Sequence, residues 1–100
     1  MKERNSLMDF NVDTNLKKKD GSYNVRIKLE KEIEDHNTRE LAINLAGSIV
    51  RNNEKGIYET KLSDALLENL ILEKLNKWVP EDTGFKAVDV KVKKLALSRK

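Results

Sequence analysis

Apolar and polar side chains alternate along two stretches in the first third of the chain. The first stretch spaces its apolar residues two apart, at Met8, Phe10, Val12 and Leu16. The second repeats that spacing at Tyr23, Val25, Ile27 and Leu29. Because successive side chains of a strand point to opposite faces of a sheet, each stretch predicts a strand with one buried face.

A turn signal lies between these two predicted strands. Asp20-Gly21 favours a two-residue type I′ turn, since both central positions of that turn need a positive φ. Paired residue numbers would then sum to 41, which places these neighbours on the buried face: Leu16 with Val25, Thr14 with Ile27, Val12 with Leu29 and Met8 with Ile33. On the other face the same register places Asp13 opposite Lys28 and Asn15 opposite Arg26.

The middle of the chain changes to helical spacing. Asn37 and Glu40 stand three apart, as in a capping box, and predict a helix from about Thr38 to Asn53. Its apolar face consists of Leu41, Ala42, Leu45, Ala46, Ile49 and Val50. Gly56 has the conformational freedom to close this helix.

A short strand and more helix are predicted next. Residues 57–60 are β-prone, and residues 61–79 are helical, with Ser63 as a cap and Pro80 as the end. Apolar residues nearly encircle the segment, which predicts either one central helix or two helices that turn near Glu68-Asn69.

The end of the chain returns to alternation after a turn over residues 80–84. Val88, Val90 and Val92 share one parity, while Leu95 and Leu97 have the other. A bulge at Lys93-Lys94, or the end of strand pairing there, would bring both sets to the buried face. It would also leave Lys91, Lys93 and Lys94 close together and pointing outward.

Length and composition narrow the class of protein. One hundred residues, 38% of them hydrophobic, predict a single α+β domain over residues 1–100, with a β-hairpin at 8–33 and a core at 38–97. No cysteine is present, which excludes disulfides and Cys-containing zinc sites. The sequence holds no signal peptide and no run long enough to span a membrane, so we expect a cytoplasmic protein without a membrane partner.

The positive charge is concentrated at the end of the chain. Residues 84–100 contain six bases and one acid, Asp89, although the net charge of the whole chain is only +3. A basic strand of this kind favours contact with phosphates. The lysine run at the tip of the predicted hairpin, residues 17–19, would add further contacts with phosphates. The predicted DNA-binding residues are Lys17, Lys18, Lys19, Arg26, Lys86, Lys91, Lys93, Lys94 and Arg99. The lysines of the last strand have a second interpretation, as protection of an exposed sheet edge.

The chain from Leu41 onward resembles winged helix-turn-helix domains. The residues that carry the resemblance are a first helix at 41–50, a linker at 53–58, helices at 62–67 and 70–79, and a wing at 85–97. The resemblance implies binding to double-stranded DNA. However, the segment in the position of the recognition helix, residues 70–78, is mostly apolar and offers only Lys74 and Lys77. We therefore expect the basic β-elements to make the contact.

Two other functions remain open. Residues 75–84 resemble the Pro-x-Asp-Thr-Gly turn of phage neck and tail-completion proteins, which implies a structural role in assembly. The hairpin edge could alternatively bind another protein, as in a small inhibitor or adaptor. Enzymatic activity is not expected, because the chain has one histidine, no cysteine and no glycine-rich phosphate loop, and no cofactor or metal is predicted. His36, beside Glu34 and Asp35, is expected at the surface.

The pattern as a whole predicts an N-terminal β-hairpin followed by a winged-helix-like domain: helix, short strand, one long or two short helices, and a basic C-terminal strand or wing. The expected function is that of a non-enzymatic DNA-binding accessory protein, which suggests a plasmid or phage factor that marks a site for a larger nucleoprotein machine. The expected partners are duplex DNA and that machine, with a homodimer left open.

Overall fold

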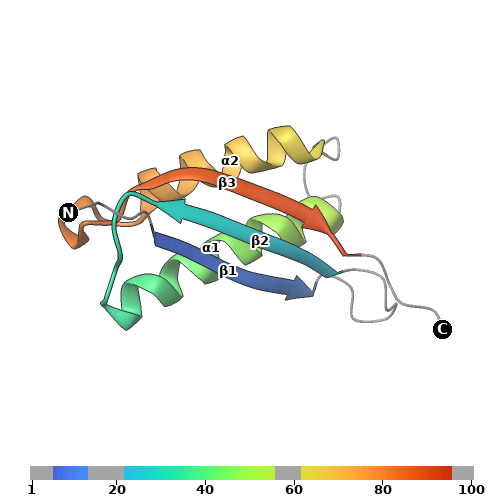
Figure 1. The fold of residues 1–100 in the computed structure, drawn as a ribbon. Coiled ribbons are helices and arrows are strands. Elements are labelled where there is room, and N and C mark those ends of the chain that lie inside the picture. Colours follow the sequence, from blue (N-terminus) through green and yellow to red (C-terminus); the bar gives the residue numbers. More distant parts are fainter. Residues whose placement is uncertain (1–5, 14–21, 56–61, 96–100) are drawn as a thin grey trace.

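A three-stranded antiparallel sheet, with helices on one of its faces, forms the fold (Figure 1). The computed structural model describes residues 6–13, 22–55 and 62–95. The elements follow in the order β1 (Ser6–Asp13), β2 (Ser22–Leu29), α1 (His36–Lys55), α2 (Asp64–Trp78), a 3₁₀ turn η1 (Glu81–Thr83) and β3 (Ala87–Lys94). The α+β class is therefore confirmed. The predicted strand at 57–60 lies outside the described residues.

The pairing of β1 with β2 differs from the predicted register. Phe10 lies opposite Val25 and Met8 opposite Ile27, so paired numbers sum to 35 and not to 41. Asp13 lies opposite Ser22 rather than Lys28. The shift is an even number of residues, so the alternation still buries the predicted face. Alternation determines only which face of each strand is buried. The turn signal at Asp20-Gly21 did not predict the register correctly, and these two residues lie outside the described residues.

The third strand pairs with β2, so the hairpin and the C-terminal strand belong to one sheet. Lys91 lies opposite Arg26 and Val92 opposite Val25. The irregularity in this pairing is at Lys28/Leu29, opposite the start of β3, so the bulge predicted at Lys93-Lys94 is wrong. The alternative prediction, that pairing ends there, agrees with β3 ending at Lys94. The irregularity at Lys28/Leu29 changes which residues of β3 point to the core. Ala87 and Val90 are both buried, whereas Val88 between them is exposed. The predicted burial of Val88 is thus wrong.

The first helix begins earlier than predicted. Asp35 accepts a hydrogen bond from the amide of Thr38 at 3.0 Å and another from the Thr38 hydroxyl at 2.7 Å. An acceptor side chain that bonds the amide three residues later is an N-cap. The predicted cap at Asn37 is therefore wrong, since Asn37 already lies inside α1.

The second helix is one continuous element. Ser63 caps it by accepting from the amide of Leu66 at 3.3 Å, as predicted, and Val79 before Pro80 has extended geometry. One helix thus spans the position where the winged-helix resemblance expects two, at 62–67 and 70–79. In the described part of the chain, α1 and α2 are the two α-helices.

The core lies between the sheet and both helices. Its buried members come from β2, α1, α2 and β3, and include Val25, Ile27, Leu29, Ala46, Val50, Leu67, Ile71, Leu75 and Val90. Only Val12 of β1 is buried, whereas Met8 and Phe10 are partly buried against the core. Trp78, the last residue of α2, is 60% exposed and lies outside this core.

Candidate nucleic-acid interface

Neither of the described helices covers the outer face of the sheet, which lies on the side away from α1 and α2 (Figure 1). Both helices lie behind the sheet in this view, so the strands present their alternate side chains freely on the near side. The outward residues of β2 and β3 include four exposed bases, which we call the basic face: Arg26, Lys28, Lys91 and Lys93. Lys28 and Arg26 come from the central strand and the other two from an outer strand.

The register brings three of the predicted site residues together. Lys91 is directly opposite Arg26, and Lys93 is opposite Asn24, two residues before Arg26. Neighbouring strands are about 4.8 Å apart, and residues two apart on one strand are about 6.6 Å apart. Both spacings are shorter than the Debye length of about 8 Å at physiological ionic strength, so these charges act on a ligand together.

Carboxylates limit the basic face on both sides. Asp9 of β1 lies opposite Arg26 and forms an ion pair with it at 3.2 Å, and it also accepts from the Asn24 amide at 2.6 Å. Asp89 of β3 lies opposite Lys28. The side chains of Lys91 and Lys93, in contrast, take part in no ion pair with the described residues. The positive potential is therefore strongest over the C-terminal half of β3.

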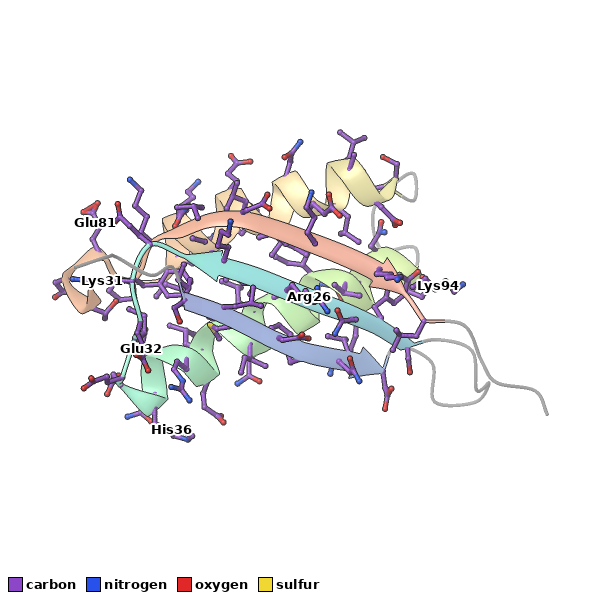
Figure 2. All side chains as sticks on the ribbon, viewed as in Figure 1. Arg26, Lys31, Glu32, His36, Glu81 and Lys94 are labelled. Carbon is purple, nitrogen blue, oxygen red and sulfur yellow. The ribbon has the colours of Figure 1, made fainter. Side chains whose placement is uncertain are left out.

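The remaining described site residues lie at the margins. Lys94 is opposite Tyr23, on the helix side of the sheet, and its Nζ is 6.0 Å from the centre of the Tyr23 ring. Lys86 is exposed just before β3 begins. Figure 2 shows Lys94 near one end of the sheet and Arg26 along its face. Lys17, Lys18, Lys19 and Arg99 lie outside the described residues.

Tyr23 fixes the end of β2 to α1. Its ring is 5% exposed, and its hydroxyl donates to Glu54 Oε1 at 2.7 Å. Burial, followed by the hydrogen bond to the Glu54 carboxylate, raises the pKa of Tyr23 well above its usual value. The hydroxyl therefore stays protonated and keeps this link throughout the physiological range.

Side chains of α2 hold the outer edge of β3. Asn76 donates to the carbonyl of Ala87 and accepts from the same residue's amide, both at 2.9 Å. Glu68 accepts from the amide of Val92 at 2.9 Å. These contacts pair backbone groups that an outer strand otherwise leaves open. Sequence reasoning missed both residues, because a polar position on an apolar helix carries no sign of which strand it meets.

No described residues form a site for a metal ion. Within the described ranges, no group of three His, Cys, Asp or Glu side chains converges in this way. His36 is exposed and lies 3.7 Å from Glu40 on the same helix. Likewise, neither described helix has the length and apolar character needed to cross a membrane.

The fold and the basic face were compared with known proteins at three levels. Family models, curated proteins and solved structures give no match to this chain.

Proposed function

We propose that this protein binds double-stranded DNA through the basic face of its sheet. The observation that supports the proposal is the pairing of Lys91 with Arg26, with Lys93 beside them, on a face that no helix covers. Exposed bases on adjacent strands suit a ligand with regularly spaced phosphates, and β-sheets are among the elements that proteins place in DNA grooves.

The composition of the outer face favours duplex over single-stranded DNA. Proteins that hold single strands stack bases on aromatic side chains. In the described strands, the aromatic residues Phe10 and Tyr23 have the parity of the helix side, and the outer face has none. Contacts from lysine and arginine to phosphates position a protein on a duplex without unstacking its bases. We therefore expect binding with little sequence preference from the basic face itself.

The aspartates on the outer face of β1 indicate how the duplex would lie on the sheet in the proposed complex. Asp9 and Asp13 on β1 would repel phosphates, whereas β3 lies at the opposite side of the sheet. The duplex would thus lie over β2 and β3, with β1 turned away from it. A protein bound in this way leaves β1 and the helices accessible, which fits an accessory role beside a larger nucleoprotein machine in the cytoplasm.

A charge-reversal experiment tests the proposal. Lys91→Glu with Lys93→Glu should weaken binding to a random-sequence duplex by about tenfold or more at low salt, because two phosphate contacts become repulsive. The matched control reverses Lys74 and Lys77 on α2, which lies on the other side of the sheet, and should leave the affinity within about threefold of the wild type. Fluorescence anisotropy with labelled duplex measures both, and circular dichroism verifies the fold. A larger loss from the α2 pair would refute the assignment to the sheet.

A further inference from the structure

The two outer strands of the sheet differ in how their edges are covered. The edge of β3 is bonded by Asn76 and Glu68 of α2, as described above. On β1, the covering contact among the described residues is that of Arg51, whose Nε donates to the carbonyl of Asp13 at 3.2 Å. The rest of the β1 edge, from Ser6 to Asn11, receives no side-chain hydrogen bond from α1 in the described part of the chain.

The ladder shows which β1 residues turn their backbone groups outward. Leu95 donates its amide to the carbonyl of Ser22, so the even-numbered residues of β2 bond toward β3. The odd-numbered residues of β2 therefore form their backbone hydrogen bonds with β1. Their partners there are the even-numbered residues of β1. It follows that the amides and carbonyls of Leu7, Asp9 and Asn11 point away from the sheet. These groups can receive another strand.

A pocket of about 300 Å³ lies beside this edge. It is lined by β1 residues, by the connection after β2 and by α1, including Met8, Phe10, Ile33, Glu32, Arg39 and Ile43. Figure 1 shows the N-terminal half of α1 extending past the start of β1, below the sheet in this view. Met8 and Phe10 point to this side and are only partly buried. An added strand would therefore meet a mixed surface on its helix side, with Met8, Phe10 and Ile43 beside Glu32 and Arg39.

The charges around the edge are mostly negative. Asp9 and Asp13 lie on the outer face of β1, which contains no lysine or arginine. The connection from β2 into α1 adds Glu30, Glu32, Glu34 and Asp35 against one lysine, Lys31. The first helix adds two bases near the edge, Arg39 beside the pocket and Arg51 at the carbonyl of Asp13, so acids still outnumber bases. Figure 2 shows Glu32 near the start of α1, away from Lys94 at the other end of the sheet. A strand bound here should place basic side chains on the outer face, opposite the aspartates.

A second copy of the chain is a poorer occupant. In an antiparallel pair, directly opposed residues share a face, so two β1 strands would bring Asp9 and Asp13 of both copies to one side. Like charges across neighbouring strands are destabilising. The aspartates of β1 thus favour a basic partner strand over the β1 strand of a second copy.

We propose that the open edge of β1 binds an extended segment of a partner protein in which apolar and basic residues alternate. Its backbone bonds Leu7, Asp9 and Asn11, its apolar side chains enter the pocket beside Met8 and Phe10, and its basic side chains meet Asp9 and Asp13. This surface adjoins the basic face at the ion pair between Asp9 and Arg26, but its backbone groups and its pocket belong to the other side of β1, so the inference does not rest on DNA binding.

Peptides as long as β1 test the proposal. A Lys/Val alternating peptide, titrated into the isotope-labelled protein, should slow hydrogen exchange of the amides of Leu7, Asp9 and Asn11 at least about tenfold. The amides of Met8 and Phe10, already bonded to β2, should change little. A Glu/Val peptide of the same length should bind at least about tenfold more weakly. Equal binding of the two peptides, or protection spread evenly along β1, would overturn the proposal.

A pair of variants isolates the backbone contact. Leu7→Pro removes one outward amide without removing a bond to β2, whereas Leu7→Ala removes the same side chain and keeps the amide. The proline variant should lose peptide binding by about tenfold relative to the alanine variant. Asn11→Pro provides a second test should Leu7→Pro fold poorly. Equal peptide binding by the proline and alanine variants would refute the backbone contact. Protection of the same amides without any peptide, through self-association, would refute the assignment of a partner protein.

Discussion

Asp35 determines where α1 begins, although the sequence favoured Asn37. Both residues are good N-caps, and each has a polar residue three positions later, Thr38 or Glu40. The structure uses the earlier pair, with the Thr38 amide and hydroxyl both bonded to Asp35. Local propensity therefore predicted that a helix begins here, but it did not decide between the two neighbouring caps.

Replacing Asp35 should make the start of α1 less stable in a pH-dependent way. The hydrogen bonds from the Thr38 hydroxyl and amide lower the pKa of Asp35 in the folded state. Its stabilising effect is thus present above the usual value of 3.8 and is lost as the pH falls through the lower folded-state pKa. Asp35→Ala should reduce Tm at pH 7, and the difference from the wild type should shrink in acid. An equal difference at all pH values, measured by thermal melts, would contradict this role.

Tyr23→Phe should remove the hydrogen bond between β2 and α1 but keep the contact of the ring with Lys94. The variant loses the hydrogen bond to Glu54 but keeps the ring beside Lys94, so it should cost about 1–2 kcal/mol of unfolding free energy near pH 7. Because the pKa of Tyr23 is raised, its contribution is complete below pH 10 and is lost as the pH rises further. Urea titrations at neutral and alkaline pH measure both effects. A cost that is the same at both pH values would argue against the Glu54 link.

The strands and helices followed from the sequence, but their partners did not. Period-two alternation identified β1 and β2, and Ser63 and Pro80 marked the ends of α2. The register of β1 with β2 was wrong by an even number, because alternation defines a face and not a neighbour. The pairing of β3 with β2 and the irregularity opposite Lys28/Leu29 depend on contacts between residues far apart in the sequence, from Leu29 with Ala87 to Tyr23 with Lys94, which no local pattern records.

The contact between α2 and β3 gives a prediction about these elements. Asn76→Ala should cost about 1–2 kcal/mol, because the amide and carbonyl of Ala87 lose their partner. The control is Asn69→Ala on the same helix, at an exposed position with no hydrogen bond to the described residues, which should cost less than about 0.5 kcal/mol. Chemical denaturation compares the two. Similar costs would show that Asn76 does not hold the β3 edge.

Gly84 allows the chain to turn from η1 into β3. Its φ is +87°, and a Cβ at this position would be 3.1 Å from Cε of Lys31. Gly84→Ala should therefore destabilise the protein by about 1–2 kcal/mol, mainly through the left-handed backbone. The same denaturation experiment measures it. An unchanged midpoint would mean that this turn has another conformation in solution.

Charge is unevenly distributed over the molecule as a whole. Glu32 and Glu81 lie toward one end of the sheet, whereas Lys94 lies toward the other (Figure 2). On the outer face, β1 contributes Asp9 and Asp13 and no base, whereas β3 contributes Lys91 and Lys93 beside one acid, Asp89. The sequence located the basic segment but not the acidic neighbours, because Asp9 meets Arg26 only through the register. We infer two adjoining interaction surfaces, one for phosphates and one for an extended basic segment.

The salt dependence of duplex binding tests the central proposal most directly. Four phosphate contacts from Arg26, Lys28, Lys91 and Lys93 should give a log–log slope of about −3.6. Lys91→Ala with Lys93→Ala should make the slope shallower by about 1.8, since two contacts are removed. Anisotropy titrations over a range of salt concentrations measure both slopes. A slope that the double variant leaves unchanged, or no binding at low salt, would contradict DNA binding by this face.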